Sequence, residues 1–346
     1  MPHVTRQLFF HIGPHKTGTT YIQETLAAHA AELAQLGVGY DLSRESSGFA
    51  HHDIADELVK GGDLVRSGIH RLLANLGDAP KTVISSEVLS RVSRDVWGEV
   101  LAALPGDVEC CFIVYLRSRS AALYSQWQEL VKHGAVWSLR EYLGEQLLFP
   151  YINPQINLRS VIDRLPLGPR AQIKIVIYDN LISASTDLVN HFLSQLVGVE
   201  LPRQIGTGQV VNAAFDITFL EFLRAMNMIS LRKGLPANDR FRNRLLTAMK
   251  AEPAIKAEVV RLRELMGRDM ISIELASLDR NFQFLDDFIV ERFPDAIVNP
   301  LGRAPIHLVD WPASTKKLTS NPALLSDAAV WQAMNSMHDA VWTGED

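Results

Sequence analysis

The sequence predicts an α/β protein of three layers, in which a central parallel sheet is flanked by helices. Four short apolar runs, each followed by a segment with helical spacing of its apolar residues, are typical of parallel strands that are buried on both faces. A strand, a glycine-containing loop and a helix start follow one another directly over residues 8–21. From about residue 207 the chain changes to long helical stretches, which predicts a helical C-terminal part.

The four predicted strands cover residues 7–12, 82–86, 108–116 and 172–177. After the first strand, apolar residues recur at helical spacing from Ile22 to Leu36, and Gly37 ends that helix. The segments 87–103 and 119–133 repeat the helical pattern. Because open parallel sheets bind ligands beyond the carboxyl ends of their strands, we expect the functional site at that edge.

The chain of 346 residues is 47% hydrophobic, which is enough for a large core. We expect one domain, 1–346, with a sheet-forming core over 7–200, a helical part over 207–300 and a C-terminal tail over 301–346. The main helical stretches, 215–230 and 240–267, are expected to pack on the sheet without further strands.

The net charge of −5 argues against nucleic acid as the main partner, because such binding needs a broad basic face. Cys110 and Cys111 are neighbours in a predicted strand, so their side chains point to opposite faces and a disulfide between them is not expected. The first strand begins by about Gln7, which leaves no room for a signal peptide, and no apolar run reaches membrane-spanning length. We therefore expect a cytoplasmic protein without a transmembrane segment. The sequence does not indicate an oligomeric state.

The first loop carries a lysine and leads into a helix. Backbone N–H groups at the head of a helix attract phosphate oxygens together with the helix dipole, and Lys16 adds a full positive charge. In a Walker A loop the lysine directly follows the second glycine, whereas Lys16 stands two positions before Gly18. The loop is therefore not a standard ATP or GTP site. A simpler interpretation is a helix start in which Thr20 is the N-cap and Gln23 completes a capping box.

A second candidate anion site follows the apolar run 110–116, where Arg117 stands at the strand end and Ser125 comes eight positions later. Arginine offers a planar fork of donors, and a serine in the early turns of the next helix adds a hydroxyl for the same anion. The alternative is an exposed arginine and an ordinary helix serine.

These two segments resemble the nucleotide-binding segments of sulfotransferases that use 3′-phosphoadenosine 5′-phosphosulfate (PAPS). Lys-Thr-Gly-Thr-Thr at 16–20 resembles their 5′-phosphosulfate loop, and Arg117 with Ser125 is similar to their 3′-phosphate site. The family also has a Tyr-Glu-Asp step after a later strand, where this chain has Tyr178 followed by Asp179 and Asn180. A helix from about 186 to 198 that leads to Leu-Pro at 201–202 is a further similarity.

The resemblance covers roughly residues 7–200 and is greatest to the diverse bacterial branch of the superfamily, whose acceptors are often glycans or lipids. It implies a P-loop-like fold and PAPS as cosubstrate, with no metal. It also implies a set of cofactor-binding residues, with Tyr21 and Tyr178 near the adenine: His15, Lys16, Thr17, Gly18, Thr19, Thr20, Tyr21, Arg117, Ser125 and Tyr178.

The implied reaction is an in-line displacement at sulfur, in which Lys16 stabilises charge on the departing phosphate oxygen. The acceptor, a hydroxyl or amine of a small molecule, glycan or lipid, needs a general base. Glu87 is one candidate, provided that partial burial raises its pKa, and His52 in the cluster His51-His52-Asp53 is the other. Their simpler interpretations are a carboxylate at a helix N-terminus and a capped helix start.

Arg232-Lys233-Gly234 has the composition of a further 3′-phosphate segment of the family, but the residues after it depart from that pattern. A solvated basic turn between helices is the favoured interpretation. Two other functions stay open from the sequence: a nucleotide kinase or NTPase that uses ATP and magnesium, and a non-catalytic nucleotide-binding protein of the same fold.

Overall fold

The computed structural model describes residues 5–42, 48–151, 153–199, 215–298 and 316–342. These residues form two compact units, each built from three segments of the chain. The sheet unit comprises Met1–Ala122, Tyr151–Val211 and Asp279–Pro312, and the helical unit comprises Leu123–Pro150, Asn212–Leu278 and Ala313–Asp346. The expected single domain stays a prediction, and the boundaries of the two units do not follow the predicted divisions at 200 and 300.

The sheet unit is built on a six-stranded sheet in the order β2-β3-β1-β4-β5-β7. Its strands are β1 (Arg6–His11), β2 (Val38–Gly39), β3 (Lys81–Ser85), β4 (Val108–Leu116), β5 (Ala171–Ile177) and β7 (Ile297–Val298). Every neighbouring pair is parallel, and Phe10 lies opposite Ile84 on one side and Phe112 on the other. The predicted α/β fold and its four strands are confirmed, while the two-residue edge strands β2 and β7 were not expected.

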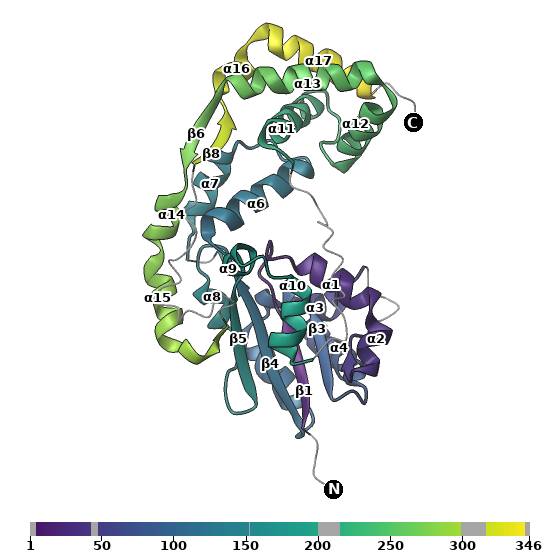
Figure 1. The fold of residues 1–346 in the computed structure, drawn as a ribbon, viewed down its shortest axis with the longest axis vertical. Coiled ribbons are helices and arrows are strands. Elements are labelled where there is room, and N and C mark those ends of the chain that lie inside the picture. Colours follow the sequence, from purple (N-terminus) through teal and green to yellow (C-terminus); the bar gives the residue numbers. More distant parts are fainter. Residues whose placement is uncertain (1–4, 43–47, 152, 200–214, 299–315, 343–346) are drawn as a thin grey trace. The chain divides into compact units, whose positions relative to one another are not determined.

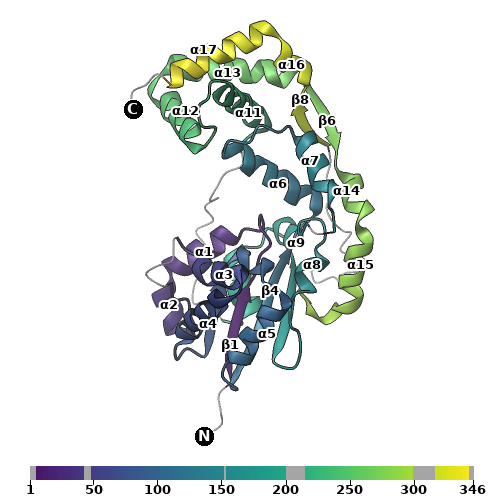
Figure 2. The same cartoon turned by 180° about the vertical axis from the view of Figure 1, so that it is seen from behind.

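Helices cover both faces of this sheet (Figures 1 and 2). One face carries α1 (Thr19–Ala28), α2 (Ala30–Gln35), α9 (Tyr178–Ser183), α10 (Leu188–His191) and a π-helical turn at Phe192–Val197. The other face carries α3 (His52–Lys60), α4 (Asp63–Leu76), α5 (Arg94–Ala103), α8 (Arg159–Ile162) and α15 (Gln283–Arg292). The short turns η1 (Glu87–Arg91) and η3 (Pro294–Ala296) and the helix α14 (Ala276–Asn281) complete the connections.

Alternation along the strands divides the core into two apolar clusters. Leu8, Phe10 and Ile12 belong to one cluster, and Phe9 belongs to the other. The cysteines follow the same rule, because Cys110 joins the first cluster and Cys111 packs against the second. Both are free cysteines.

Two predicted helices of the sheet unit are interrupted. The helix after the first loop breaks at His29 into α1 and α2, and the segment 87–103 divides into η1 and α5. The predicted helix near 186–198 is formed by α10 and the π-helical turn, and it ends at Gly198 with φ +71°. Leu201 and Pro202, which are similar to the Leu-Pro step of the sulfotransferase family, lie outside the described residues.

The helical unit contains most of α6 (Arg119–Lys132) and several helices from later parts of the chain. The latter are α7 (Leu139–Leu148), α11 (Ile217–Arg232), α12 (Asp239–Ala251), α13 (Pro253–Arg268), α16 (Pro322–Ser326) and α17 (Ala328–Trp342). An antiparallel pair joins β6 (Met270–Glu274) to β8 (Lys316–Ser320). The expectation of no strands after residue 207 was therefore wrong for β6, β7 and β8.

The predicted helix 240–267 is two helices, because Pro253 occupies the first position of α13 and cannot continue α12. The basic turn between α11 and α12 is also observed. Arg232 lies over the ring of Trp331, Lys233 pairs with Asp339, and Gly234 has φ +70°. Of the predicted tail, residues 301–315 and 343–346 lie outside the described part.

A polar stripe on α11 holds the helical unit together. Glu221 accepts hydrogen bonds from Thr319 and Ser320 of β8 at 2.7 Å and from Arg224 at 2.7 Å. Asn227 donates to the carbonyl oxygens of Val131 and Ala135 at 2.9 and 3.0 Å. These side chains are buried, so each bond replaces a lost contact with water.

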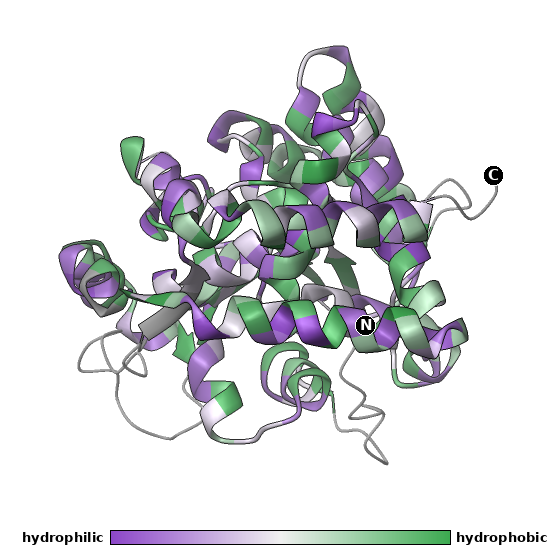
Figure 3. Cartoon of the chain, turned by 90° about the horizontal axis from the view of Figure 1, so that it is seen from above, coloured by the Kyte–Doolittle hydropathy of each residue, from purple (hydrophilic) through white to green (hydrophobic). Residues whose placement is uncertain are grey.

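Most helices are amphipathic, and Figure 3 shows hydrophilic and hydrophobic residues alternating along them. Such helices bury one face and expose the other. Among the described residues, no helix has the length and apolar character needed to cross a membrane.

Candidate anion-binding site at the carboxyl edge of the sheet

The predicted site residues follow four neighbouring strands of the sheet. Lys16, Glu87, Arg117 and Tyr178 come after β1, β3, β4 and β5 respectively. The chain leaves β1 towards β3 and leaves the adjacent strand β4 towards β5, so the direction of the connections reverses between β1 and β4. Ligands of open α/β sheets bind at such a reversal, where Lys16 and Arg117 lie on either side.

The loop after β1 has an unusual backbone. Gly13, Lys16 and Gly18 have φ of +77°, +70° and +77°. Glycine suits position 18 because this φ strains other residues, and a Cβ there would lie 2.3 Å from Leu188 Cδ2, which would have to move. Lys16 has no such freedom, so its left-handed conformation costs about 1 kcal/mol or more. The buried hydroxyl of Thr17 donates to the Pro14 carbonyl at 2.8 Å and closes the loop, so it is engaged within the protein.

Helix α1 begins without a cap. Its N-cap residue is Gly18, no side chain makes a capping hydrogen bond, and no acidic residue stands in the first turn. The expectations that Thr20 is the N-cap and that Gln23 completes a capping box were therefore wrong. Thr19 and Thr20 are instead the first two helical residues, and Thr20 is exposed. The positive end of the helix dipole is thus not neutralised by any side chain of its own first turn.

Arg117 connects the predicted anion-binding segments. Its Nη1 donates to the Lys16 carbonyl oxygen at 2.6 Å, and its guanidinium lies 5.3 Å from the centroid of the Tyr178 ring. The Nε of Arg117 is a buried donor that has no partner among the described residues. Burial raises the pKa of the Tyr178 hydroxyl, against the opposing effect of Arg117, so the ring stays neutral beneath the guanidinium. The structure therefore brings Lys16, Arg117 and Tyr178 together, as the sequence predicts.

Helix α6, which follows Arg117, begins very differently. Asp179 accepts from the backbone N–H of Ser118 at 2.8 Å and from its hydroxyl at 3.2 Å. Asp279 accepts from the backbone N–H groups of Arg119 and Ser120 at 2.7 and 3.3 Å. The carboxylates of Asp179 and Asp279 thus accept from the backbone N–H groups at the N-terminus of α6, which we call the closed end. Sequence reasoning treated Asp179 only as a departure from the family pattern and did not identify Asp279.

Glu87 is an ionised carboxylate held by its neighbours. Gln23 Nε2 donates to Glu87 Oε2 at 3.2 Å, and His15 Nδ1 lies 3.7 Å from Glu87 Oε1. Burial raises the pKa of Glu87, but hydrogen bonds from its own backbone and Gln23, and the nearby His15 and His52, outweigh burial and lower it. The condition for Glu87 to act as a general base, a pKa raised by partial burial, is therefore not met, and Glu87 is a weak proton acceptor.

The two neighbouring histidines of α3 have different roles. His51 is buried between Ser85 N, which donates to its Nδ1 at 3.2 Å, and the Asp41 carbonyl, 3.0 Å from its Nε2. Burial lowers the pKa of His51, in keeping with a neutral structural residue. His52 is partly exposed, and its Nδ1 lies 2.8 Å from the Ser86 hydroxyl, which orients the ring. Of the pair, His52 is the more exposed, and its role as a general base stays a prediction.

A chain of buried polar side chains connects Glu87 to His11. Gln23 Nε2 also donates to Ser85 Oγ at 3.2 Å, and Ser85 Oγ lies 2.8 Å from His11 Nδ1. Burial lowers the pKa of His11 to about 4, although Glu87 opposes the shift. Sequence reasoning missed this chain. The available signal was Gln23, a polar residue on the face of α1 that otherwise carries Ile22 and Leu26.

The remaining predicted residues are less informative. The Tyr21 hydroxyl donates to Asp187 at 3.2 Å. Burial lowers the pKa of His15, against the effect of Glu87. Ser125 lies on α6 in the helical unit, so its role stays a prediction. Within the described ranges, no three His, Cys, Asp or Glu side chains are grouped to hold a metal ion.

Comparisons with known proteins add no relative: no family model, curated protein or solved structure matches the chain.

Proposed function

We propose that the protein is a PAPS-dependent sulfotransferase that moves a sulfuryl group from PAPS to a hydroxyl or amine of an acceptor, with glycans and lipids as the implied acceptor classes. One observation carries this proposal. The hydrogen bond from Arg117 to the Lys16 carbonyl at 2.6 Å joins two segments that resemble the 5′-phosphosulfate loop and the 3′-phosphate site of PAPS-dependent sulfotransferases.

Each group has a role in this proposal. The uncapped N-terminus of α1 and Lys16 bind the 5′-phosphosulfate, and the remaining donors of Arg117 bind the 3′-phosphate. The ring of Tyr178 lies beside the adenine. The roles implied for Ser125 at the 3′-phosphate and for Tyr21 at the base stay predictions.

The reaction breaks the bond between sulfur and the bridging phosphate oxygen and forms a bond between sulfur and the acceptor atom. The electron pair of the broken bond stays on the phosphate oxygen, whose charge Lys16 and the amides of α1 stabilise. The acceptor proton passes to Glu87 or His52. Because the pKa of Glu87 is lowered, a rate that stays constant from pH 7 to pH 5 indicates Glu87 as the base, and a rate that falls over this range argues against Glu87.

The binding test compares adenosine 3′,5′-bisphosphate with Mg-ATP by thermal unfolding. At a hundredfold excess over its dissociation constant, the bisphosphate stabilises the protein by about 2.7 kcal/mol. Lys16→Ala and Arg117→Ala each abolish this shift, whereas Lys60→Ala, which removes an exposed lysine at the end of α3, retains it. A larger shift with Mg-ATP would favour the kinase function instead, and no shift with the bisphosphate would contradict the proposal.

The catalytic test distinguishes an enzyme from a non-catalytic nucleotide-binding protein. Incubation with PAPS and pools of glycan or lipid acceptors is expected to release the bisphosphate in an acceptor-dependent manner, and Lys16→Ala to stop the release. Binding of the bisphosphate without any acceptor-dependent release would support the non-catalytic alternative.

A further inference from the structure

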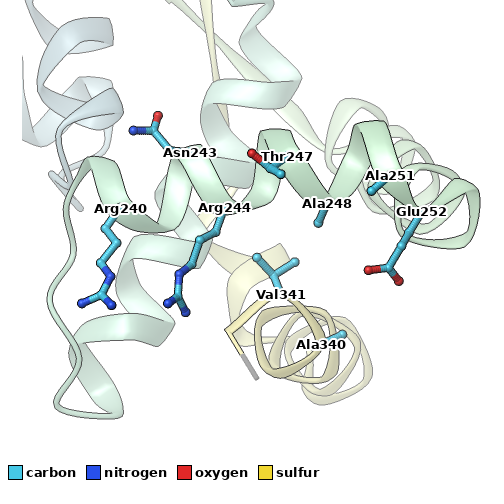
Figure 4. A pocket seen from close by; sticks show the side chains of 9 residues that line it. All are labelled: Arg240, Asn243, Arg244, Thr247, Ala248, Ala251, Glu252, Ala340 and Val341. Atoms are coloured by element: carbon cyan, nitrogen blue, oxygen red, sulfur yellow. The ribbon is translucent and has the colours of Figure 1, made fainter. Parts of the chain in front are cut away.

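The helical unit contains a groove that the proposed function does not use. It lies between α12 and α17 and has a volume of about 730 Å³. Pockets for small organic ligands fall in the range of roughly 300–1,000 Å³. Figure 4 shows the residues that line it, most of which belong to α12.

The residues of α12 that line the groove form two rows at helical spacing. One row consists of Arg240, Arg244, Ala248 and Glu252, each four residues apart, and the other includes Asn243 and Thr247. Both guanidinium groups lie at one end of the groove and extend to the same side of α12, whereas the Asn243 amide points to the other side (Figure 4). That end is built from hydrogen-bond donors suited to an anion.

Arg244 is held in position at this end. Its Nη1 donates to the Trp342 carbonyl at 3.1 Å, and its guanidinium lies 5.0 Å from the centroid of the Trp342 ring. The positive charge at this end of the groove is complementary to a carboxylate, sulfate or phosphate group.

The middle of the groove is apolar. Ala248 and Ala251 of α12 line it on one side, and Ala340 and Val341 of α17 line it on the other. The distance from Arg244 to Ala251 along the helix axis is about 10 Å at 1.5 Å per residue. These small side chains leave room for an aliphatic chain of that length, and Glu252 at the far end disfavours a second anionic group.

We propose that this groove binds a small amphiphilic anion, with its acidic head at Arg240 and Arg244 and its aliphatic body along Ala248, Ala251 and Val341. The groove lies wholly within the helical unit, so the proposal does not depend on the sulfotransferase function. A medium-chain carboxylate such as octanoate has the required head and length.

Octanoate binding is measured by isothermal titration calorimetry, with circular dichroism to verify that each variant is folded. Octanoate is expected to bind the unmodified protein, Arg240→Gln to weaken binding at least threefold, and Ala251→Trp to abolish it by filling the groove. The matched control is Lys250→Gln, which removes an exposed charge of the same helix outside the groove and is expected to leave binding unchanged.

Three ligand controls isolate the head and the chain: octan-1-ol lacks the charge, octylammonium reverses it, and acetate lacks the chain. Each is expected to bind at least tenfold more weakly than octanoate. Equal binding of any control, no binding of octanoate, or equal weakening by Lys250→Gln would overturn the proposal.

Discussion

Helices α1 and α6 follow neighbouring strands at the same edge of the sheet, yet their N-termini are built in opposite ways. The end of α1 has no capping side chain, no acid in its first turn and a lysine in a left-handed conformation before it. At α6, Asp179 and Asp279 accept hydrogen bonds from the backbone N–H groups of Ser118, Arg119 and Ser120. Carboxylates of the protein itself close the N-terminus of α6, whereas no side chain caps the first turn of α1, which leaves that helix end suited to an anion.

The largest effect on stability is expected at the closed N-terminus of α6, where Arg119 is fully buried. Its guanidinium donates to both carboxylate oxygens of Asp286 at 2.6 and 2.8 Å and to the Ile156 carbonyl at 2.7 Å. Arg119→Ala leaves the Asp286 charge buried without its partner, so the free energy of unfolding falls by about 3–5 kcal/mol. Urea denaturation measures this loss.

Two controls make the Arg119 result specific. Arg261→Ala removes an exposed arginine that pairs with Glu258, and its expected cost is below about 1 kcal/mol. The double variant Arg119→Met/Asp286→Leu removes both buried charges and is expected to recover most of the loss. If Arg119→Ala cost no more than Arg261→Ala, the closed end would not be the stabilising one.

A smaller effect on stability is expected at His11, which lies at the inner end of the polar chain that leads to Glu87. His11 is buried, and its Nε2 has no partner among the described residues. Its pKa is about 4 in the folded protein, against 6.5 when unfolded, so the unfolded state binds the proton first as the pH falls. Stability is therefore lost between about pH 6.5 and pH 4, by about 3 kcal/mol from this group. The measurement is the free energy of unfolding as a function of pH.

His11→Asn keeps a donor for Ser85 and removes the titrating group. Its stability is expected to fall less steeply than that of the unmodified protein between pH 6.5 and pH 4. Identical slopes for the two proteins would show that His11 is not a buried neutral histidine.

The smallest effect on stability is expected at Lys16. Glycine adopts φ of +70° without strain, so Lys16→Gly relieves about 1 kcal/mol in the folded state, part of which is offset by the greater freedom of glycine in the unfolded chain. We expect the free energy of unfolding to stay equal or rise slightly, while binding of the bisphosphate is lost. Thermal unfolding with and without ligand measures both. A clear destabilisation would mean that the Lys16 side chain supports the fold and not the ligand.

The sequence predicted the parts of this molecule that depend on local patterns. Continuous apolar runs identified β1, β3, β4 and β5, and their shared edge correctly grouped Lys16, Arg117 and Tyr178. The edge strands β2 and β7 have two residues each, too few to form a pattern. The carboxylates at α6 come from 61 and 160 residues away, and no local spacing reports such contacts. Glu87 shows the same limit, because its pKa depends on Gln23, His15 and His52, which lie on other elements.

The interleaving of the two units has a consequence for how the protein can be dissected. Asp279 and Asp286, which complete the start of α6, belong to the third segment of the sheet unit, after Leu123–Pro150 and Asn212–Leu278 of the other unit. A truncated chain that stops near residue 200 would contain the whole lysine loop, Arg117 and Asp179. It would lack the carboxylates of Asp279 and Asp286. During synthesis on the ribosome, Arg119 must therefore wait for more than 150 further residues before its charge is neutralised.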